Sequence, residues 1–460
     1  MGIHLKKGGN PEVKSKDDFK EKHPNYRNFF VDPEPPLSSR PEPTPKLNFK
    51  ELLVNYNKQH GHPLKPVNPK KSQTRVPKNS ICKSCNAPAK YLYFNDGKKR
   101  SQLKCKVCGG LSTVHPRHKS KTKYFCPHCE HPLVLWKTRL LSSIYKCYNN
   151  NCRAYLSNLS KLNSREKLLY KTKPVQFKLR YHFREYHFSA KHLSLSAPKE
   201  SPCIFNIHNS LNTLCLALTF HVSFGLSARK TALVLNNVFS ISISRQTIIN
   251  YAQHAAYYCH SFNLHHKGSV DDTQAGDEAY IKIKGKQFYT FFFICSKSRK
   301  ISAYHIHNSR DTLPATIAMN EAIRTAVPDQ NIILITDGNP SYLAGIHFIN
   351  QAFSKSLSHK KVIGIQNLDS VSEEFRPFKQ LIERLNRTYK FHIRAAHGFK
   401  NFNGAIALTT LFVTHYNFIR PHSSLNYSVP VPLPELEDIH TFQGKWAKIL
   451  TMAADLPAAA

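Results

Sequence analysis

The chain has 460 residues, enough for about three domains. Lysine and arginine outnumber aspartate and glutamate by 66 to 29, a formal net charge of +37. An excess of this size is unusual for a metabolic enzyme and predicts a polyanionic partner. No apolar stretch is long enough to span a bilayer and none resembles a signal peptide, so we expect an intracellular protein without a membrane partner.

Residues 1–79 are expected to form a disordered basic arm. They hold 12 of the 28 prolines, and their apolar residues are scattered. A short helix near residues 47–56 is the one element expected here. Both a solvated tail and a segment that contacts phosphate agree with this composition.

Residues 80–160 carry two sets of four cysteines at paired spacing. The first set is Cys82, Cys85, Cys105 and Cys108, and the second is Cys126, Cys129, Cys147 and Cys152. A tight pair of thiolates on each of two turns supplies the four soft ligands of a tetrahedral Zn²⁺. We therefore predict two tandem zinc ribbons with two structural Zn²⁺ ions. Free or disulfide-bonded cysteines are the alternative.

Other residues near these cysteines have predicted roles. Residues 95–97 (Asn-Asp-Gly) predict a hairpin turn inside the first ribbon. His128 and His131 are expected to be exposed, because four cysteines already complete the second site. Three apolar residues are expected to pack over that second metal: Leu133, Leu135 and Trp136. The four cysteines without pair spacing are expected to be small core residues: Cys203, Cys215, Cys259 and Cys295.

Residues 161–265 are interpreted as a basic linker followed by a helical DNA-binding domain. Residues 161–191 interleave cations and aromatic rings, which suits either nucleic acid or a linking pair of strands. Helices are predicted over 211–224, 228–237 and 245–259, the last two capped by Ser227 and Ser244. Two short helices joined by a turn suggest a helix-turn-helix, with Arg245, Gln246 and Asn250 facing the major groove. A purely structural helical bundle is the competing interpretation.

Residues 266–428 have the pattern of an α/β domain. Alternation over 279–283 and the turns after it predict an antiparallel meander with strands at 279–283, 288–295 and 300–307, and with Asp277 at its head. Residues 332–335 form a β-branched run that predicts a strand buried on both faces, ending at Asp337. A carboxylate at that place is typical of α/β active sites, although it can also cap the following helix.

Two helices are predicted after this strand. The first has apolar residues at helical spacing: Phe378, Leu381, Ile382, Leu385 and Tyr389. Glu383, Arg387 and Lys390 form one stripe beside that apolar face. The second helix, over 404–418, has these residues on its inner side: Ile406, Leu408, Leu411, Phe412 and His415. Residues 429–460 are rich in proline and alanine at both ends, with one short amphipathic stretch near residues 446–452, and are expected to be an uninformative tail.

The order of these elements resembles the ribonuclease-H-like core of DDE transposases and retroviral integrases. The segments GDEAYIKIKGK, ILITDGNPSY, FKQLIERLNRTYK and FVTHYNFIRPHSSL resemble transposases of bacterial and archaeal insertion sequences, over about residues 276–425. The fold class implied is multidomain: an α/β core with a mixed sheet flanked by helices, preceded by zinc ribbons and a helix-turn-helix. By the resemblance, Asp277, Asp337 and Glu383 are the catalytic triad. The 45 residues between the last two exceed the usual spacing, and the excess is assigned to a loop over 367–377.

The resemblance also implies a reaction and its partners. Three carboxylates can hold two Mg²⁺ (or Mn²⁺) ions for in-line phosphoryl transfer, without a nucleophilic side chain. The implied function is a transposase that cleaves and joins double-stranded DNA at element ends and target, acting as a dimer or higher homo-oligomer, in the cytoplasm and associated with the nucleoid. The first alternative is an inactive transposase that serves as a DNA-binding regulator. The second is a nuclease on the same fold.

Neighbouring acids compete for two of the three triad positions. Asp277 shares the strand face of Ala279, whereas Glu278 has the opposite parity, and Asp271 and Asp272 lie upstream of the strand. Two further acids, Glu373 and Glu374, are expected at the start of the helix that carries Glu383. The alternative role for Glu383 is a surface ion pair with Arg387.

Overall fold

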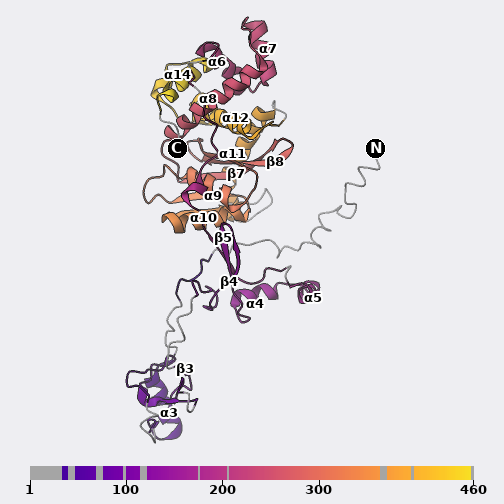
Figure 1. Cartoon of the computed structure of the whole chain (residues 1–460). Coiled ribbons are helices and arrows are strands. Elements are labelled where there is room, and N and C mark those ends of the chain that lie inside the picture. Colours follow the sequence, from indigo (N-terminus) through magenta and orange to yellow (C-terminus); the bar gives the residue numbers. More distant parts are fainter. Residues whose placement is uncertain are drawn as a thin grey trace, which may run out of the picture. The chain divides into compact units, whose positions relative to one another are not determined.

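The computed structural model describes residues 34–39, 47–68, 76–96, 100–113, 122–174, 177–201, 203–204, 207–362, 370–394 and 398–456. The chain divides into two compact units, the first reaching Arg184 and the second beginning at Glu185 (Figure 1). None of the helices in the described ranges combines the length and apolar character that a membrane span requires.

The first ribbon is a three-stranded antiparallel sheet in the order β1-β2-β3. Its elements are the short 3-10 helix η3 (Ala89–Tyr91) and the strands β1 (Leu92–Phe94), β2 (Gln102–Cys105) and β3 (Leu111–Thr113). The β1–β2 hairpin confirms the predicted reversal of the chain. The Asp96 carboxylate accepts hydrogen bonds from the backbone N–H groups of Ser101 and Gln102, at 2.7 and 3.0 Å. Gly97 lies outside the described residues.

Part of the expected disordered arm is folded. Helix α3 (Phe49–His60) begins after Asn48, whose side chain accepts the N–H of Lys50. Its apolar residues pack against the core of the first ribbon, and the backbone N–H of Phe49 donates to the carbonyl of Cys85 at 3.1 Å. The prediction of a short helix is confirmed, and the prediction of disorder is wrong for residues 47–68. The abundant prolines concealed a short amphipathic stretch that has a partner only in the folded ribbon.

The second ribbon is a sheet in the order β4-β5-β6. Its elements are β4 (Val134–Arg139), β5 (Ser142–Lys146), α4 (Arg153–Ser160), α5 (Ser164–Thr172) and β6 (His182–Tyr186). Strand β6 comes from the expected linker, so this sheet extends beyond residue 160. Leu133 is buried as predicted, but Leu135 and Trp136 are 52% and 38% exposed, so their predicted packing over the metal is wrong. They belong to β4, an edge strand whose six side chains are all exposed.

The second unit is built on a five-stranded mixed sheet in the order β11-β10-β7-β8-β9. Its strands are β7 (Thr273–Ile283), β8 (Lys286–Cys295), β9 (Ile301–His307), β10 (Ile332–Thr336) and β11 (Leu357–Lys361). The predicted meander β7-β8-β9 is antiparallel, and β10 is parallel to both β7 and β11. Asp277 lies inside β7 rather than at its head, because Thr273, Gln274 and Ala275 already pair with β10.

Helices cover both faces of this sheet (Figure 1). One layer holds α9 (Thr312–Ala322) and α10 (Pro340–Phe353), and the other holds α11 (Ser370–Arg394) and α12 (Phe402–Thr414). Along β8, Phe291 and Phe293 belong to the core under the first layer, whereas Phe292 belongs to the core under the second. Gly276 lies against Phe293, and a Cβ at this position would overlap the ring. The continuous apolar run of β8 therefore reflects a strand that is buried on both faces.

The helical region that precedes the sheet shares its core. Its elements are the 3-10 helix η6 (Ala190–Leu193), α6 (Leu211–Leu218), the π-helical turn η7 (Thr219–Ser223), α7 (Ala228–Val238) and α8 (Arg245–His265). The side chains of Ser227 and Ser244 cap α7 and α8, as predicted. Helix α8 runs beyond its expected end at residue 259, because Phe262 is buried against Phe418. The boundary expected near 265 therefore falls inside one shared core, and the division into two domains stays a prediction.

The C-terminal tail is part of this core, which corrects the expectation that it is uninformative. After α12 come the π-helical turn η8 (His415–Ile419), the 3-10 helix η9 (Ser423–Leu425), α13 (Pro434–Glu437) and α14 (Phe442–Ala454). Trp446 is fully buried, and its Nε1–H donates to Oγ of Ser223 at 3.1 Å. Helix α14 packs against α6 and α8. The amphipathic stretch expected near residues 446–452 lies within α14, but its packing partners are set by the fold.

Candidate active site and metal centres

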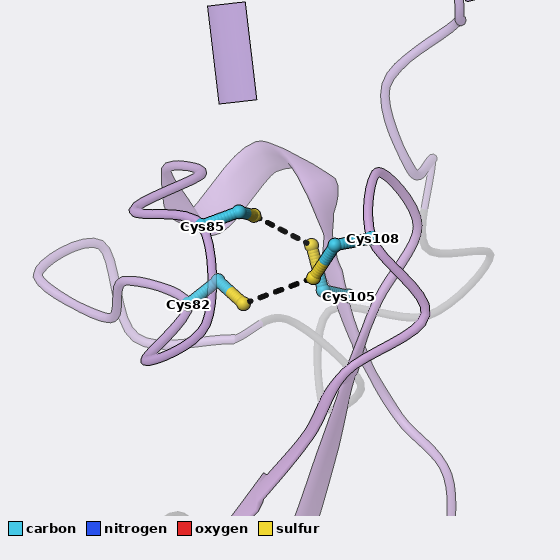
Figure 2. Close-up of side chains that lie close together, drawn as sticks. All are labelled: Cys82, Cys85, Cys105 and Cys108. Carbon is cyan, nitrogen blue, oxygen red and sulfur yellow. Dashed lines mark hydrogen bonds between the residues drawn. The ribbon is translucent and has the colours of Figure 1, made fainter. Parts of the chain in front are cut away.

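The four cysteines of the first ribbon converge at one point, two from each of its turns (Figure 2). The sulfurs of Cys82 and Cys108 are 3.5 Å apart, and those of Cys85 and Cys105 are 3.7 Å apart. A tetrahedral Zn²⁺ with Zn–S bonds of about 2.3 Å has its sulfurs about 3.8 Å apart. The donor set and its spacing therefore fit a structural zinc ion.

The second ribbon repeats this arrangement. The sulfurs of Cys126 and Cys152 are 3.9 Å apart, and those of Cys129 and Cys147 are 3.6 Å apart. This second group also fits a four-thiolate zinc site.

The residues around the cysteine groups only partly follow expectation. His131 is exposed as predicted. His128 is not, because its side chain is only 19% exposed and its Nδ1 lies 3.4 Å from the carboxylate of Glu34. Of the cysteines expected in the core, Cys203 is exposed, so that prediction is wrong. The other three are buried: Cys215, Cys259 and Cys295.

A cavity of about 430 Å³ opens in the second unit where β10 ends. Its lining includes the three acids of the predicted triad, Asp277, Asp337 and Glu383, together with Arg387 and Lys390. The other lining residues are Glu278, Tyr280, Arg310, Lys379 and Asn386. Residues from a meander strand, the end of a parallel strand and a helix thus line one cavity. The acids whose oxygens lie within 4.8 Å of one another are Asp277, Glu278 and Asp337, a group that does not include Glu383, so the assignment of Glu383 to the triad stays a prediction.

The sheet register places the first two acids side by side. Ile335 of β10 pairs with Ala275 of β7, and Asp337 and Asp277 each lie two residues further along. One oxygen of Asp277 lies 2.9 Å from Nζ of Lys379 and 3.4 Å from Nδ2 of Asn386, both on α11. Asp277 therefore faces α11, as its strand parity predicted.

Asp337 begins the turn between β10 and α10. Its carboxylate accepts the backbone N–H of Asn339 at 2.9 Å and lies 3.6 Å from the guanidinium of Arg310. The cap of α10 is Asn339, whose side-chain oxygen accepts the N–H of Ser341. The capping role considered for Asp337 is therefore filled by another residue, and Asp337 remains turned toward the cavity.

Glu278 also belongs to this site, although its strand parity pointed away from it. Its side chain is only 1% exposed, and its two oxygens contact Arg310 at 3.2 Å and Nδ2 of Asn339 at 3.0 Å. Burial raises the pKa of Glu278, and the charge of Arg310 opposes that shift. Carboxylate oxygens of Asp277, Glu278 and Asp337 all lie within 4.8 Å of one another. Because β10 ends at Thr336, both faces of β7 reach the same opening beyond that point.

Glu278 belongs to a ring of hydrogen bonds that links three segments: β7, the β9–α9 loop and the β10–α10 turn. Glu278 contacts Arg310 and Asn339, the oxygen of Asn339 accepts from Ser341, and Oγ of Ser341 donates to the carbonyl of Arg310 at 2.8 Å. The guanidinium of Arg310 also donates to the hydroxyl of Tyr280 at 2.8 Å. The ring fixes the β9–α9 loop and the β10–α10 turn against β7, and so holds Asp337 in place.

Helix α11 presents a polar stripe to the cavity. Lys379, Glu383, Asn386, Arg387 and Lys390 follow one another at helical spacing, and all five line the cavity. Glu383 is exposed, and no ion pair links it to Arg387 within the described residues. The alternative of a surface ion pair is therefore not the arrangement found.

The start of α11 differs from expectation. The helix begins at Ser370 and continues through Pro377, so the loop expected over 367–377 is wrong from residue 370 onward, and 367–369 lie outside the described residues. Glu373 lies in the first turn, with Glu374 beside it, as predicted. Neither belongs to the described lining of the cavity.

The residues expected to read DNA lie at the start of α8. Arg245, Gln246 and Asn250 are all exposed, and Nε2 of Gln246 donates to the side-chain oxygen of Asn250 at 2.9 Å. Gln246 and Asn250, one turn apart, therefore lie on one face of the helix, and contact of the three residues with a DNA groove stays a prediction.

Some cavity residues were missed from the sequence. Lys379 and Asn386 had a signal, because they lie four residues before and three residues after Glu383 on the same helix face. Tyr280 shares the strand parity of Glu278. Arg310 had no such signal, since only the fold brings the β9–α9 loop to the end of β10.

Comparison with known families identifies one segment of the chain. Residues 377–430 match the integrase core domain family. This segment begins at Pro377 of α11 and contains Glu383, Arg387 and Lys390, followed by α12. A search among curated proteins finds no match.

Several solved structures are similar to the chain at low identity. The catalytic core domain of HTLV-2 integrase, in complex with magnesium, is 13% identical; the alignment covers 35% of this chain and 96% of that one, with a TM-score of 0.23. The simian T-cell lymphotropic virus intasome, in complex with PP2A regulatory subunit B56 gamma, is 17% identical, with 49% and 80% covered and a TM-score of 0.26. The Mos1 strand transfer complex is 10% identical, with 53% and 89% covered and a TM-score of 0.17. These scores are too low to carry weight of their own. Residues 377–430 are therefore similar to the integrase core domain family, within the part of the chain whose motifs resemble those of DDE transposases.

Proposed function

We propose that the protein is a transposase that binds the ends of its own mobile element, cleaves them and joins them to target DNA. The observation that carries this proposal is the cavity lined by Asp277, Asp337 and Glu383 together with cations of α11. Carboxylates grouped beside lysine and arginine suit a reaction in which a phosphodiester approaches bound metal ions.

The acids of the cavity fit divalent metal ions. Asp277, Glu278 and Asp337 offer oxygens within 4.8 Å of one another, and carboxylate oxygen is the ligand that Mg²⁺ prefers. Glu383 lines the same cavity from α11 and would complete the triad. Two Mg²⁺ ions held there would polarise the phosphate and stabilise both the attacking and the leaving oxygen. Glu278 is less suited to be a ligand, because both of its oxygens are already used by Arg310 and Asn339.

The cations of the cavity would hold the DNA backbone. Arg387 and Lys390 are exposed on the stripe that carries Glu383, so a phosphate at the acids lies within their reach. Lys379 and Arg310 contact Asp277 and Asp337 and would keep these carboxylates oriented. Orientation of the acids before DNA arrives reduces the cost of assembling the site.

Recognition of the element ends is assigned to the first turns of α8. Arg245, Gln246 and Asn250 can donate to base edges if this end of α8 enters a major groove. The basic excess of the chain would supply affinity that does not depend on sequence. A homo-oligomer is proposed as well, since two element ends must be processed together.

The test uses the full chain, loaded with zinc, and duplexes that carry the DNA flanking its coding region. We expect Mg²⁺-dependent nicking and joining by the wild type, and binding without cleavage by Asp337→Asn. Asp329→Asn is the matched control, because Asp329 is an exposed acid outside the cavity, and it should cleave normally. Cleavage by Asp337→Asn would overturn the proposed chemistry. A wild-type chain that binds these ends but never cleaves them would instead be the DNA-binding regulator.

A further inference from the structure

The outer strand of the second ribbon carries a surface that neither the cavity nor α8 explains. All six side chains of β4 are exposed, including Trp136 at 38%. The pairing of β4 with β5 shifts between Leu135 and Lys137, which makes Trp136 the extra residue of a β-bulge. Bulges redirect a side chain out of the regular alternation of a strand. The sheet thus places a large aromatic ring at its surface instead of in its core.

Two ammonium groups flank this ring. Nζ of Lys137 lies 4.4 Å from the centre of the Trp136 ring, and Nζ of Lys146 lies 4.9 Å from it. His182, on β6, also lies close to this ring, with its ring centre 5.4 Å from that of Trp136. We call Trp136, Lys137, Lys146 and His182 the β4 face. Interaction with an indole ring holds a lysine at a fixed place without neutralising its charge.

Positive charge predominates in the part of the chain that carries the β4 face. Residues 130–186 hold 12 lysines and arginines and three acids, Glu130, Glu166 and Glu185, of which Glu166 is engaged in the capping box of α5. Within the described residues, neither Lys137 nor Lys146 makes an ion pair. Burial, followed by the charge of Lys146, lowers the pKa of His182 to about 4. This shift agrees with a site where positive charge is concentrated.

We propose that the β4 face binds the phosphate backbone of duplex DNA, as a contact separate from the cavity and from α8. The two lysines would each contact a phosphate, and Trp136 would keep them spaced and rest against the sugars. The choice of DNA rests on the proposed function, and the charge of the face excludes a basic or purely apolar partner.

The experiment measures binding without catalysis. The full chain, loaded with zinc and carrying Asp337→Asn, is titrated without Mg²⁺ against a fluorescent 30-bp duplex at several salt concentrations, using anisotropy. The test variant is Lys137→Gln with Lys146→Gln. The control variant is Lys355→Gln with Lys448→Gln, which removes the same charge from two exposed positions of the second unit. Zinc content and circular dichroism confirm that each variant is folded.

The expected result is a weakening of binding that is specific to the β4 face. Removal of two lysines that each neutralise a phosphate should reduce the slope of log Kd against log salt by about 1.8, at 0.9 per phosphate. The control should keep the slope of the parent. Trp136→Ala should weaken binding, and Trp136→Phe should restore part of it, because the ring and not merely the bulge is needed.

Three outcomes overturn the proposal. The first is a test variant with the slope of the control. The second is a lysine effect on a single strand of the same length that is absent with the duplex. The third is a test variant that binds the duplex as tightly as the parent but no longer binds an acidic protein. A parent chain that binds no duplex at all would instead contradict the proposed function, so the two failures are distinguishable.

Discussion

Replacement of Glu278 by glutamine tests the buried ring that holds the β10–α10 turn. The substitution keeps the shape of the side chain but removes its charge, and one of its two acceptors becomes a donor facing Arg310 or Asn339. A hydrogen bond to a charged partner contributes about 1.5–3 kcal/mol, and breaking a buried pair costs about 3–5 kcal/mol. Because the Arg310 side chain is 33% exposed and can regain water, we expect the low end of this range, a loss of about 2–3 kcal/mol.

The assay is urea unfolding of the full chain at constant zinc concentration, in which the unfolding transition of the second unit is monitored. For a unit of roughly 280 residues, at about 2.1 cal/mol/K of unfolding entropy per residue, the expected loss lowers the midpoint of thermal unfolding by about 3–5 °C. Asp329→Asn is again the control, because Asp329 is exposed at a positive φ of 62° that asparagine tolerates, and it should change the free energy of unfolding by less than about 0.5 kcal/mol. If Glu278→Gln is as stable as this control, the ring does not hold the turn and the reasoning is refuted. Calorimetric titration with Mg²⁺ adds a second criterion: affinity should fall much more in Asp337→Asn than in Glu278→Gln if Glu278 positions the site without binding metal.

Three further predictions concern the metals, the triad and pH. Elemental analysis should find about two Zn²⁺ per chain, and chelation should unfold the ribbons while the second unit keeps its own transition; a chain free of zinc would contradict this. Glu383→Gln should abolish Mg²⁺-dependent cleavage and leave folding and end binding intact, whereas Glu374→Gln should cleave normally; the reverse pattern would show that the triad is misassigned. Burial lowers the pKa of His260 and His359 to about 4 and of His305 to about 3, so the unfolded chain binds protons that the folded chain does not. Stability should therefore be complete above pH ~6.5 and fall on acidification toward pH ~4, by up to about 1.4 kcal/mol per pH unit for each histidine, and a flat profile between pH 7 and 5 would exclude this.

Features that depend on residues close together in the chain were predicted correctly from the sequence. The strands of the meander, the buried strand that ends at Asp337 and the caps Ser227 and Ser244 all follow from neighbours only a few residues apart. The cysteine groups followed too, because ligand spacing is set by the metal and the turn rather than by the rest of the fold. Expectations were incomplete where a segment depends on a distant partner. Short helical stretches were expected in the arm and in the tail, but not that α3 packs on the first ribbon or that α14 belongs to the core of the second unit.

At the cavity, the contribution of the sequence can be distinguished most clearly from that of the tertiary structure. Sequence alone determined which residues bring carboxylates and cations: Asp277, Asp337, Glu383 and the stripe that follows on α11. Only the tertiary structure decided that Arg310 joins them and that Glu278 reaches the same opening from the other face of β7. The physical reason is that strand parity describes a side chain only where both neighbouring strands continue, and β10 stops at Thr336. Where a strand ends, the neighbours of a residue are set by packing between segments far apart in the chain, and no local pattern encodes them.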